Sequence, residues 1–449
     1  MTKNQINNGE SQEKVNAFFW FRRDLRLEDN AGLYKALTRS NGVQPLFIFD
    51  ENILEKLSNP KDARVTFIHQ RLQKLQSQLR EAGSDLWVFY GRPEAIWKDL
   101  LSKHNPETIF LNRDYEPYGL RRDEEIVQLS RSHNAEVIGT KDHVIFEKGE
   151  VVKGDGNPYT VFSPYAKKWR ATLTEEDVQH FPSEGSLDSL RPSTSNFIIP
   201  TLESMGFEEN ALTSVEATLP KDIVSTYGQT RNFPANERGT TRMGVHLRFG
   251  TVSTRKLVRE GRELSDTYEN ELIWRDFYQM ILYHFPHSVD QAIKPAYDQI
   301  EWEVNEEHFA AWREGKTGYP LVDAGMRELN TTGYMHNRVR MVVASFLTKH
   351  LLLDWRWGER YFAEKLLDFD LASNIGGWQW ASGSGCDAAP YFRVFNPALQ
   401  LDKFDKDLKY VKKWVPEYGT PQYPQPIVEH KWARERALSV YKAGLNAQK

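Results

Sequence analysis

The sequence predicts an N-terminal α/β domain built on a parallel sheet, followed by a domain made only of helices. Strand-like and helical stretches alternate in the first third of the chain, whereas strand-like runs disappear after Tyr227. The length of 449 residues also exceeds the roughly 100–200 residues of a typical domain. We expect a disordered tail over 1–15, the α/β domain over 16–148, a linker over 149–225 and the helical domain over 226–449.

Four apolar runs in the first domain are typical of buried strands, at 17–21, 45–49, 85–90 and 108–112. Between the second and third runs, Val65, Leu72 and Leu79 recur at helical spacing. This alternation predicts a Rossmann-like parallel sheet covered by helices on both faces. The first strand leads into FRRDLRLEDN, which lacks the G-x-G-x-x-G glycines that let a dinucleotide pyrophosphate approach the backbone. We therefore expect this sheet not to bind a dinucleotide in the usual way.

The composition excludes several classes of protein. A formal net charge of −4 excludes a globally basic nucleic-acid-binding protein, so contact with a polyanion needs a local patch. The single cysteine, Cys386, excludes an internal disulfide and thiolate-rich metal sites, and we expect no bound metal. The polar start of the chain is unlike a signal peptide, and no run of about 20 apolar residues could span a membrane. We expect a cytoplasmic protein, associated with the nucleoid if it is prokaryotic.

The helical half begins with a candidate phosphate site. In RGTTRMGVHLRFG (238–250), Gly239, Thr240 and Thr241 precede a predicted helix. Free backbone N–H groups and hydroxyls at a helix start suit a phosphate. An ordinary helix capped by threonine explains the same pattern.

Two further predicted helices, 272–284 and 335–353, carry polar residues on one face. Glu271 and Trp274 lie three residues apart, which suits either recognition of a base or half-buried packing. Asn337, Arg340 and Met341 also share a face, and they would be unusual as a wholly buried stripe. The other helices are expected over 251–264, 307–314, 320–329 and 359–371.

The segment 366–397 combines acids with indoles. Asp368, Asp370 and Asn374 precede Trp378 and Trp380. Buried acids and amides need hydrogen-bond partners, which a flavin ring supplies. A metal would be the other partner for paired aspartates, but the nearby aromatics and the lack of further ligands disfavour it.

Together these segments resemble the photolyase–cryptochrome family over nearly the whole chain. The matching motifs occur in the family's order: FWFRRDLRLEDN (19–30), GKTGYPLVDAGMREL (315–329) and GGWQWASGSGCDAAPYFRVFNP (376–397). The resemblance implies an antenna-type α/β domain, a wrapping linker and an all-helical domain that binds a U-shaped FAD. Among family members, the residues are most similar to those of class I cyclobutane pyrimidine dimer photolyases.

The resemblance implies the residues that contact FAD, namely Tyr227, Thr240, Thr241, Arg242, Met243, Gly244, Arg340, Asp368, Phe369, Asp370 and Asn374. Arg340 is expected to pair with Asp368. Asn374 corresponds to the position opposite flavin N5, where a neutral amide helps sustain the reduced anionic flavin. In the segment expected to contact the FAD phosphates, Gly244 replaces the hydroxyl residue of the family, so one FAD contact is expected to be weaker while the backbone donors remain.

The resemblance also implies light-dependent repair of pyrimidine dimers in double-stranded DNA by a monomer. Photoexcited reduced FAD donates an electron to the flipped-out dimer. Trp302, Trp355 and Trp378 resemble the family's electron-transfer chain, although they equally suit core packing. Glu271 and Asn374 are the other expected catalytic residues. The residues expected to contact the lesion or the DNA are Arg231, Glu271, Trp274, Tyr278, Asn337, Arg338, Met341, Trp380 and Gln400.

Several alternatives remain open at this stage. Tyr118 and Gly119 stand where folate-binding relatives carry an Asn–Glu pair, so a second antenna chromophore could be deazaflavin, folate, another flavin or absent. Five lysines, at positions 403, 406, 409, 412 and 413, suit either DNA contact or a solvated helix face. A cryptochrome photoreceptor and an electron-transfer flavoprotein or oxidoreductase are the rival functions.

Overall fold

The computed structural model describes residues 15–193, 196–211 and 216–446, in two compact units. The sheet unit comprises Met1–His143, His180–Asn210 and Phe249–Ser253, and the helical unit comprises the remainder. The expected linker, 149–225, is divided between the units, with 149–179 and 211–225 in the helical unit and 180–210 in the sheet unit. Apart from Val15, the expected disordered tail lies outside the described residues.

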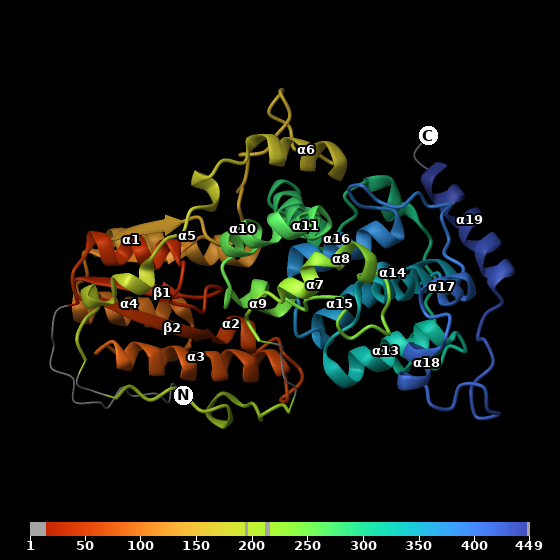
Figure 1. Cartoon of the computed structure of the whole chain (residues 1–449), viewed down its shortest axis with the longest axis horizontal. Coiled ribbons are helices and arrows are strands. Elements are labelled where there is room, and N and C mark those ends of the chain that lie inside the picture. The colour runs from red at the N-terminus through yellow and green to blue at the C-terminus, as the bar shows by residue number, and fades with distance from the viewer. Residues whose placement is uncertain (1–14, 194–195, 212–215, 447–449) are drawn as a thin grey trace. The chain divides into compact units, whose positions relative to one another are not determined.

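The sheet unit contains the predicted parallel sheet (Figure 1), whose five strands follow the order β3-β2-β1-β4-β5. The strands are β1 Ala17–Phe21, β2 Val43–Asp50, β3 Trp87–Gly91, β4 Thr108–Asn112 and β5 Glu136–Thr140. The sequence analysis missed β5. This strand lies at the sheet edge and is largely half-exposed, so it lacks the continuous apolar run of a strand buried on both faces.

Helices cover both faces of the sheet (Figure 1). The helices are α1 Ala31–Arg39, α2 Glu51–Leu54, α3 Ala63–Glu81, α4 Pro93–His104 and α5 Pro117–Ser132. Phe18 and Trp20 of β1 pack with Trp97 of α4 and Ile126 of α5 on one face. Phe49 of β2 contacts His69 of α3 on the other face. Strands covered on both sides are uniformly apolar, which is why the sequence revealed them.

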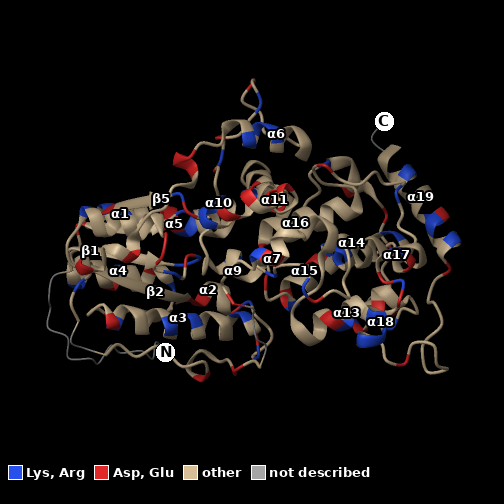
Figure 2. Ribbon diagram, viewed as in Figure 1, with Lys and Arg blue, Asp and Glu red and all other residues tan. Residues whose placement is uncertain are grey.

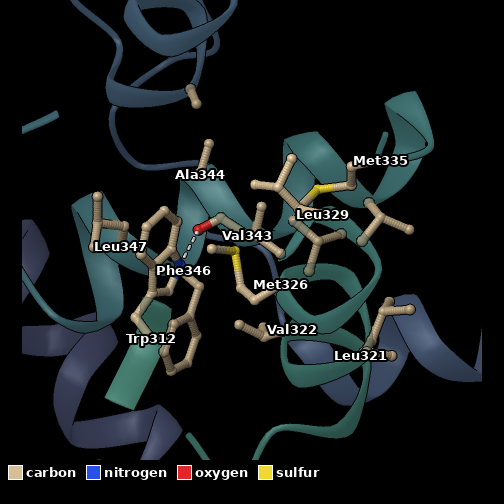
Figure 3. Packing of buried hydrophobic residues seen from close by; sticks show 14 of the residues in the cluster. Trp312, Leu321, Val322, Met326, Leu329, Met335, Val343, Ala344, Phe346 and Leu347 are labelled. Carbon is tan, nitrogen blue, oxygen red and sulfur yellow. Dashed lines mark hydrogen bonds between the residues drawn. The ribbon is translucent and has the colours of Figure 1, made fainter. Parts of the chain in front are cut away.

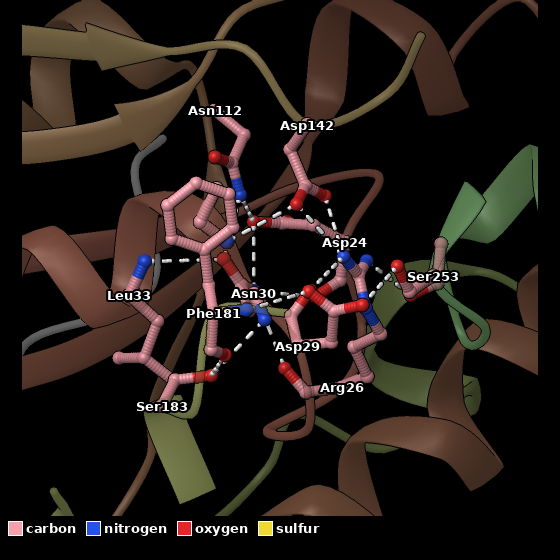
Figure 4. Close-up of polar contacts among 12 residues, drawn as sticks. Asp24, Arg26, Asp29, Asn30, Leu33, Asn112, Asp142, Phe181, Ser183 and Ser253 are labelled. Carbon is pink, nitrogen blue, oxygen red and sulfur yellow. Dashed lines mark hydrogen bonds and ion pairs between the residues drawn. The ribbon is translucent and has the colours of Figure 1, made fainter. Parts of the chain in front are cut away.

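The FRRDLRLEDN segment that follows β1 forms a buried polar network (Figure 4). The Asn112 side-chain amide donates to Asp24 at 2.6 Å and to Asn30 at 2.8 Å. Arg26 donates to both carboxylate oxygens of Asp142 at 2.8 Å. The Asn30 side chain also caps α1. These hydrogen bonds join the segment after β1 to the ends of β4 and β5 and to the start of α1, and the Asn112 side-chain oxygen is left without a partner among the described residues.

The helical unit contains no strand among its described residues, as predicted. Its α-helices are α6 Phe162–Thr172, α7 Lys221–Ser225, α8 Tyr227–Thr230, α9 Gly244–Phe249 (its last residue belongs to the sheet unit), α10 Thr254–Leu264, α11 Asp266–His284, α12 Glu306–Glu314, α13 Pro320–Thr332, α14 Asn337–Ser345, α15 Trp355–Lys365, α16 Leu371–Ser382, α17 Pro397–Phe404, α18 Lys409–Trp414 and α19 His430–Asn446.

Two predicted helices end differently from expectation. The helix predicted over 359–371 is α15, which ends at Lys365. Asp370 then starts α16, because its side chain accepts a hydrogen bond from the Ser373 N–H at 3.0 Å. The helix predicted over 335–353 starts at Asn337, where the His336 side chain accepts the Arg338 N–H, and passes into a π-helical turn, Phe346–His350.

A hydrophobic core of the helical unit gathers around Trp312 (Figure 3). Its indole N–H donates to the Val343 carbonyl at 3.1 Å, inside an otherwise apolar cluster. Val339, Val342 and Val343 turn one face of α14 into this core. The opposite face of α14 therefore remains for Asn337, Arg340 and Met341, which line a cavity.

Candidate functional site

A cavity of about 380 Å³ lies within the helical unit, a size in the range of small-molecule sites. Twelve of the residues singled out in the sequence line it: Arg231, Glu271, Trp274, Tyr278, Asn337, Arg340, Met341, Asp368, Asp370, Asn374, Trp378 and Trp380. Arg275, Ala344, Phe362, Leu366, Ser373 and Gly377 complete the lining. Four segments that were distant in sequence thus meet at one site, which we call the main cavity.

Helix α11 supplies one wall of the main cavity. Glu271, Trp274 and Tyr278 recur at intervals of three and four residues, so they share one helical face. Glu271 forms an ion pair with Arg231, which follows α8. Burial raises the pKa of the Glu271 carboxyl, while the Arg231 charge opposes that rise. The wall therefore combines aromatic surface with a carboxyl whose pKa is raised by burial.

The two expected lesion-stacking indoles both reach this cavity. Trp274 comes from α11 and Trp380 comes from α16. Trp274 also stacks on Phe162, with ring centroids 3.7 Å apart and ring planes within 4°. Sequence reasoning missed Phe162, which lies in the expected linker, because no periodic pattern connects it with α11.

An ion pair and a capping acid shape the opposite end of the cavity. Arg340 donates to both oxygens of Asp368, at 2.9 and 3.0 Å, as expected. Asp370 accepts from the Gln279 side-chain amide at 3.1 and 3.2 Å. Gln279 was not predicted, although it lies on α11 two turns after Glu271. Since both aspartates have side-chain partners, they are held in place before any ligand binds.

Asn374 is oriented by a second carboxyl. Its amide N–H₂ donates to the Glu359 carboxylate at 2.9 Å and to the Glu359 carbonyl at 3.1 Å. Burial raises the pKa of Glu359, while the Asn374 hydrogen bond opposes the rise. The amide donors of Asn374 are therefore engaged, which leaves its side-chain oxygen as the free polar group. Glu359 was also missed from the sequence.

A second cavity, of about 500 Å³, gathers the expected phosphate-contacting segment. Thr240, Thr241, Arg242 and Met243 line it. Arg242 has a φ of +52°, a left-handed conformation that non-glycine residues adopt rarely and that clusters at functional sites. The helix expected after Thr241 is α9, which has only six residues. The segment therefore acts as an irregular loop lined by hydroxyls rather than as a long helix start.

Gly244 lies against Asp368 of the main cavity. A Cβ added at Gly244 would come within 2.8 Å of the Asp368 carboxylate, so a larger residue would require this carboxylate to shift. At Gly377, which lines the main cavity, an added Cβ would meet nothing within 4 Å. A polar ring system fits the main cavity, with its carboxylate, guanidinium and amide groups, and phosphates fit the loop around Thr240. The residues present thus fit FAD.

The alternative of a metal at Asp368 and Asp370 finds no support in the geometry. Across residues 15–193, 196–211 and 216–446, no group of three or more His, Cys, Asp or Glu side chains could hold a metal ion.

No helix within these described ranges has the length and apolar character to cross a membrane.

Four expected contacts lie beside the main cavity rather than in its lining. Tyr227 packs edge-on against Tyr268, at 5.4 Å between ring centroids. Phe369 packs on the Trp312 core. Arg338 donates to Asn232 at 2.7 Å and covers the ring of Phe404 in α17, the helix that also carries Gln400. Arg338 thus joins α14 to α17.

The expected electron-transfer tryptophans occupy different surroundings. Trp378 lines the main cavity, Trp355 is buried in the core, and Trp302 contacts the buried Tyr441 at 5.7 Å. Trp378 also makes an edge contact with Trp312, at 6.1 Å between ring centroids. The chain of Trp378, Trp355 and Trp302 stays a prediction.

The lysines near the C-terminal helices have acidic neighbours (Figure 2). Lys413 pairs with Glu237 at 2.6 Å, and Lys409 lies 3.8 Å from Asp407. All four of these side chains are largely exposed. These contacts favour a solvated helix face for these two lysines over a dedicated phosphate site.

Tyr118 and Gly119, which differ from the Asn–Glu pair of folate-binding relatives, are closely packed. Tyr118 donates to Asp50 at 2.7 Å, and a Cβ added at Gly119 would come within 2.7 Å of the Asp114 carboxyl. The glutamate of folate-binding relatives would not fit at Gly119 without movement of Asp114. The identity of a second chromophore stays open among the alternatives named above.

Comparisons with known proteins agree with the site geometry. Residues 17–184 match the family described as DNA photolyase, and residues 268–420 match the FAD binding domain of DNA photolyase. A deoxyribodipyrimidine photo-lyase of Synechococcus sp. is 37% identical, over 94% of this chain and 96% of the relative. A class III photolyase structure from Agrobacterium tumefaciens aligns with a TM-score of 0.83 and 33% identity, covering 98% and 99% of the two chains. A cryptochrome structure from Synechocystis sp. aligns with a TM-score of 0.84 and 25% identity, covering 95% and 99%.

Proposed function

The chain belongs to the photolyase/cryptochrome family, and from this premise we propose that it repairs cyclobutane pyrimidine dimers in DNA with light and FAD. The observation that carries the proposal is the meeting of Glu271, Trp274, Asn337 and Trp380 around one cavity whose far end fits a flavin. An electron-transfer flavoprotein would have no need of this carboxyl and amide flanked by two indoles. The activity is that of a deoxyribodipyrimidine photolyase, of the class I type by its site residues.

FAD, when bound and photoexcited in its reduced form, supplies the electron that opens the cyclobutane ring. Asp368, Arg340 and Asp370 would surround the ring system, while Thr240 and Thr241 would contact the phosphates. Asn374 presents a neutral amide, whose donors are already held by Glu359. The protein thus positions the cofactor and adds no fixed negative charge at the Asn374 position.

The lesion would enter the main cavity as a flipped-out dinucleotide. Flipping a damaged, poorly stacked dinucleotide costs a few kcal/mol at most, which selects it over normal bases. Trp274 and Trp380 would stack on the pyrimidine rings, and Glu271 and Asn337 would hydrogen-bond their polar edges. Because burial raises the pKa of Glu271, this carboxyl is suited to donate a proton or hydrogen bond to the electron-rich dimer.

DNA contact would come from the rim of the helical unit. Arg231 lines the main cavity just after α8, Arg338 lies on α14 against Met341 of that lining, and Gln400 lies on α17. Guanidinium groups bind phosphates as bidentate donors, which orients the duplex without reading its sequence. The protein is expected to act as a monomer on double-stranded DNA.

The decisive experiment measures repair of an oligonucleotide carrying one thymine dimer by the purified protein with fully reduced FAD. Blue light is compared with darkness, and an oligonucleotide carrying a six-four photoproduct serves as the second substrate. Light-dependent loss of the thymine dimer alone establishes the proposed function. Repair of neither lesion refutes it.

A cryptochrome photoreceptor is the second candidate, because the Synechocystis cryptochrome structure superposes on 95% of this chain. A photoreceptor would photoreduce FAD without repairing either lesion. The same experiment therefore separates the two functions when FAD reduction is recorded alongside repair.

A further inference from the structure

Phe162 covers one face of the Trp274 indole. The two rings are parallel within 4° and their centroids lie 3.7 Å apart. Trp274 lines the main cavity and Phe162 does not, so the phenyl ring occupies the indole face that the cavity does not use. Phe162 is the first residue of α6, within 149–179 of the helical unit. A residue from the expected linker thus backs the proposed lesion-stacking wall.

The backbone beside Phe162 is joined to the turn that follows α16. The Asp387 N–H donates to the Thr160 carbonyl at 2.9 Å. Burial raises the pKa of the Asp387 carboxyl, and a hydrogen bond from the Phe162 N–H opposes that rise. Asp387 itself has a φ of +48°, so this turn is held in a conformation that costs free energy. Asp387 therefore clamps the start of α6 from both its backbone and its side chain.

The same turn returns to the second indole. The Ala389 N–H donates to the Trp380 carbonyl at 3.2 Å. A continuous set of contacts therefore runs from Trp274 to Phe162, through the Thr160–Asp387 pair, to Ala389 and Trp380. The two indoles come from different helices, α11 and α16, and this path connects them through residues that do not line the cavity.

We propose that residues 160–162 are a brace that sets the orientation of Trp274 relative to Trp380, with Phe162 and Asp387 as positioning residues. The brace rests on the proposed function for the identity of its substrate, a pyrimidine dimer. Its effect is on selective binding: two indoles held apart in advance accept a flipped dinucleotide without reorganising, whereas a free indole must first be ordered.

The test compares Phe162→Leu and Phe162→Tyr in the full-length protein with FAD bound. Affinities for a duplex with one thymine dimer and for the same undamaged duplex are measured separately, together with single-turnover repair of bound dimer. Phe162→Leu is expected to weaken dimer binding about tenfold, in line with the loss of one aromatic stack, and to leave binding of undamaged duplex unchanged. Phe162→Tyr retains the stack and is expected to restore the wild-type ratio.

A matched control is Phe197→Leu in the sheet unit. Phe197 also stacks on an indole, that of Trp87, at 6.1 Å and 24°. Both leucine variants lose an aromatic stack, so an equal change in dimer selectivity would overturn the brace and leave only a packing role. Failure of Phe162→Tyr to restore selectivity would overturn it as well.

The clamp is tested through Asp387→Gly, which tolerates the positive φ and removes the carboxyl. If the brace is one unit, the double variant Phe162→Leu/Asp387→Gly should lose less dimer selectivity than the sum of the losses in the two single variants. Fully additive losses would overturn the coupling. A wild-type protein that shows no preference for dimer DNA refutes the proposed function instead, so the two failures are distinguishable.

Discussion

Arg231 and Glu271 form an ion pair in the lining of the main cavity, and this pair would connect the proposed DNA contact with the protonation of Glu271. Burial raises the pKa of Glu271, and Arg231 is the group that opposes the rise. A DNA phosphate that engages Arg231 would weaken this opposition and raise the Glu271 pKa further. The proposed lesion contact would then become a better hydrogen-bond donor when DNA is bound.

Replacing Arg231 with Gln is expected to move the basic limb of the repair pH profile upward, whereas the limb would not move if Arg231 had no influence on the pKa of Glu271. The structure predicts the upward shift, because the opposing charge is removed. Single-turnover repair of prebound DNA across pH 5 to about 9 measures it. The shift should vanish in Glu271→Gln, which has no carboxyl to titrate. A shift that persists in the double variant would contradict this account.

Glu271→Ala is expected to lower single-turnover repair by about 10²-fold, the scale found when a preorganised donor to a developing charge is removed. Glu271→Gln keeps a hydrogen-bond donor and should lose less. Blue-light repair of prebound thymine-dimer DNA provides the measurement. Equal rates for the Ala and Gln variants would exclude a hydrogen-bonding role for Glu271.

Asn374→Asp would place a second carboxyl against Glu359, whose pKa burial already raises. Like charges raise both carboxyl pKa values, so the folded protein binds more protons than the unfolded chain above the unfolded pKa of about 4. Stability is therefore lost as pH rises through the folded-state values. Urea unfolding at pH 5 and pH 8 should show the larger loss, about 1–3 kcal/mol, at pH 8. Asn374→Ser adds no charge and only removes the hydrogen bond to Glu359, so its stability loss should differ less between pH 5 and pH 8.

The buried His336 is expected to lower the free energy of unfolding in mild acid. Burial lowers the pKa of His336 to about 4, so the unfolded chain, with its ordinary value of about 6.5, binds the proton first as pH falls. Stability is complete above pH 6.5 and declines toward pH 4, on the order of 2 kcal/mol by pH 5. His336→Asn keeps a side chain that can cap α14 and should flatten this decline. An unchanged decline in urea unfolding would assign the acid sensitivity to other groups.

The salt dependence of DNA affinity should change when Arg338 is replaced and stay the same when Lys413 is replaced. Arg338→Ala is expected to reduce the slope of log affinity against log salt by about 1, because one phosphate contact is lost. Lys413→Ala is the control, since Lys413 is paired with Glu237 on an exposed face. Its slope should stay at the wild-type value. A reduced slope for Lys413→Ala would place that face in contact with DNA.

The local residue pattern was enough to predict features that lie within a single helix or strand. Four strands were found because burial on both faces makes them uniformly apolar, and β5 was missed because a half-exposed edge strand lacks that signal. Glu271 with Trp274, and Asn337 with Arg340 and Met341, were paired correctly because helical spacing alone places them on one face. The family motifs supplied the remaining site residues.

The sequence by itself determined the fold class, the all-helical second half and most of the main cavity, because periodicity and residue type are local properties. Only the tertiary structure decided which groups hold those residues in place. Phe162 against Trp274, Glu359 against Asn374 and Gln279 against Asp370 each join different elements. Such contacts depend on how helices pack, and packing between distant segments leaves no periodic trace in the chain.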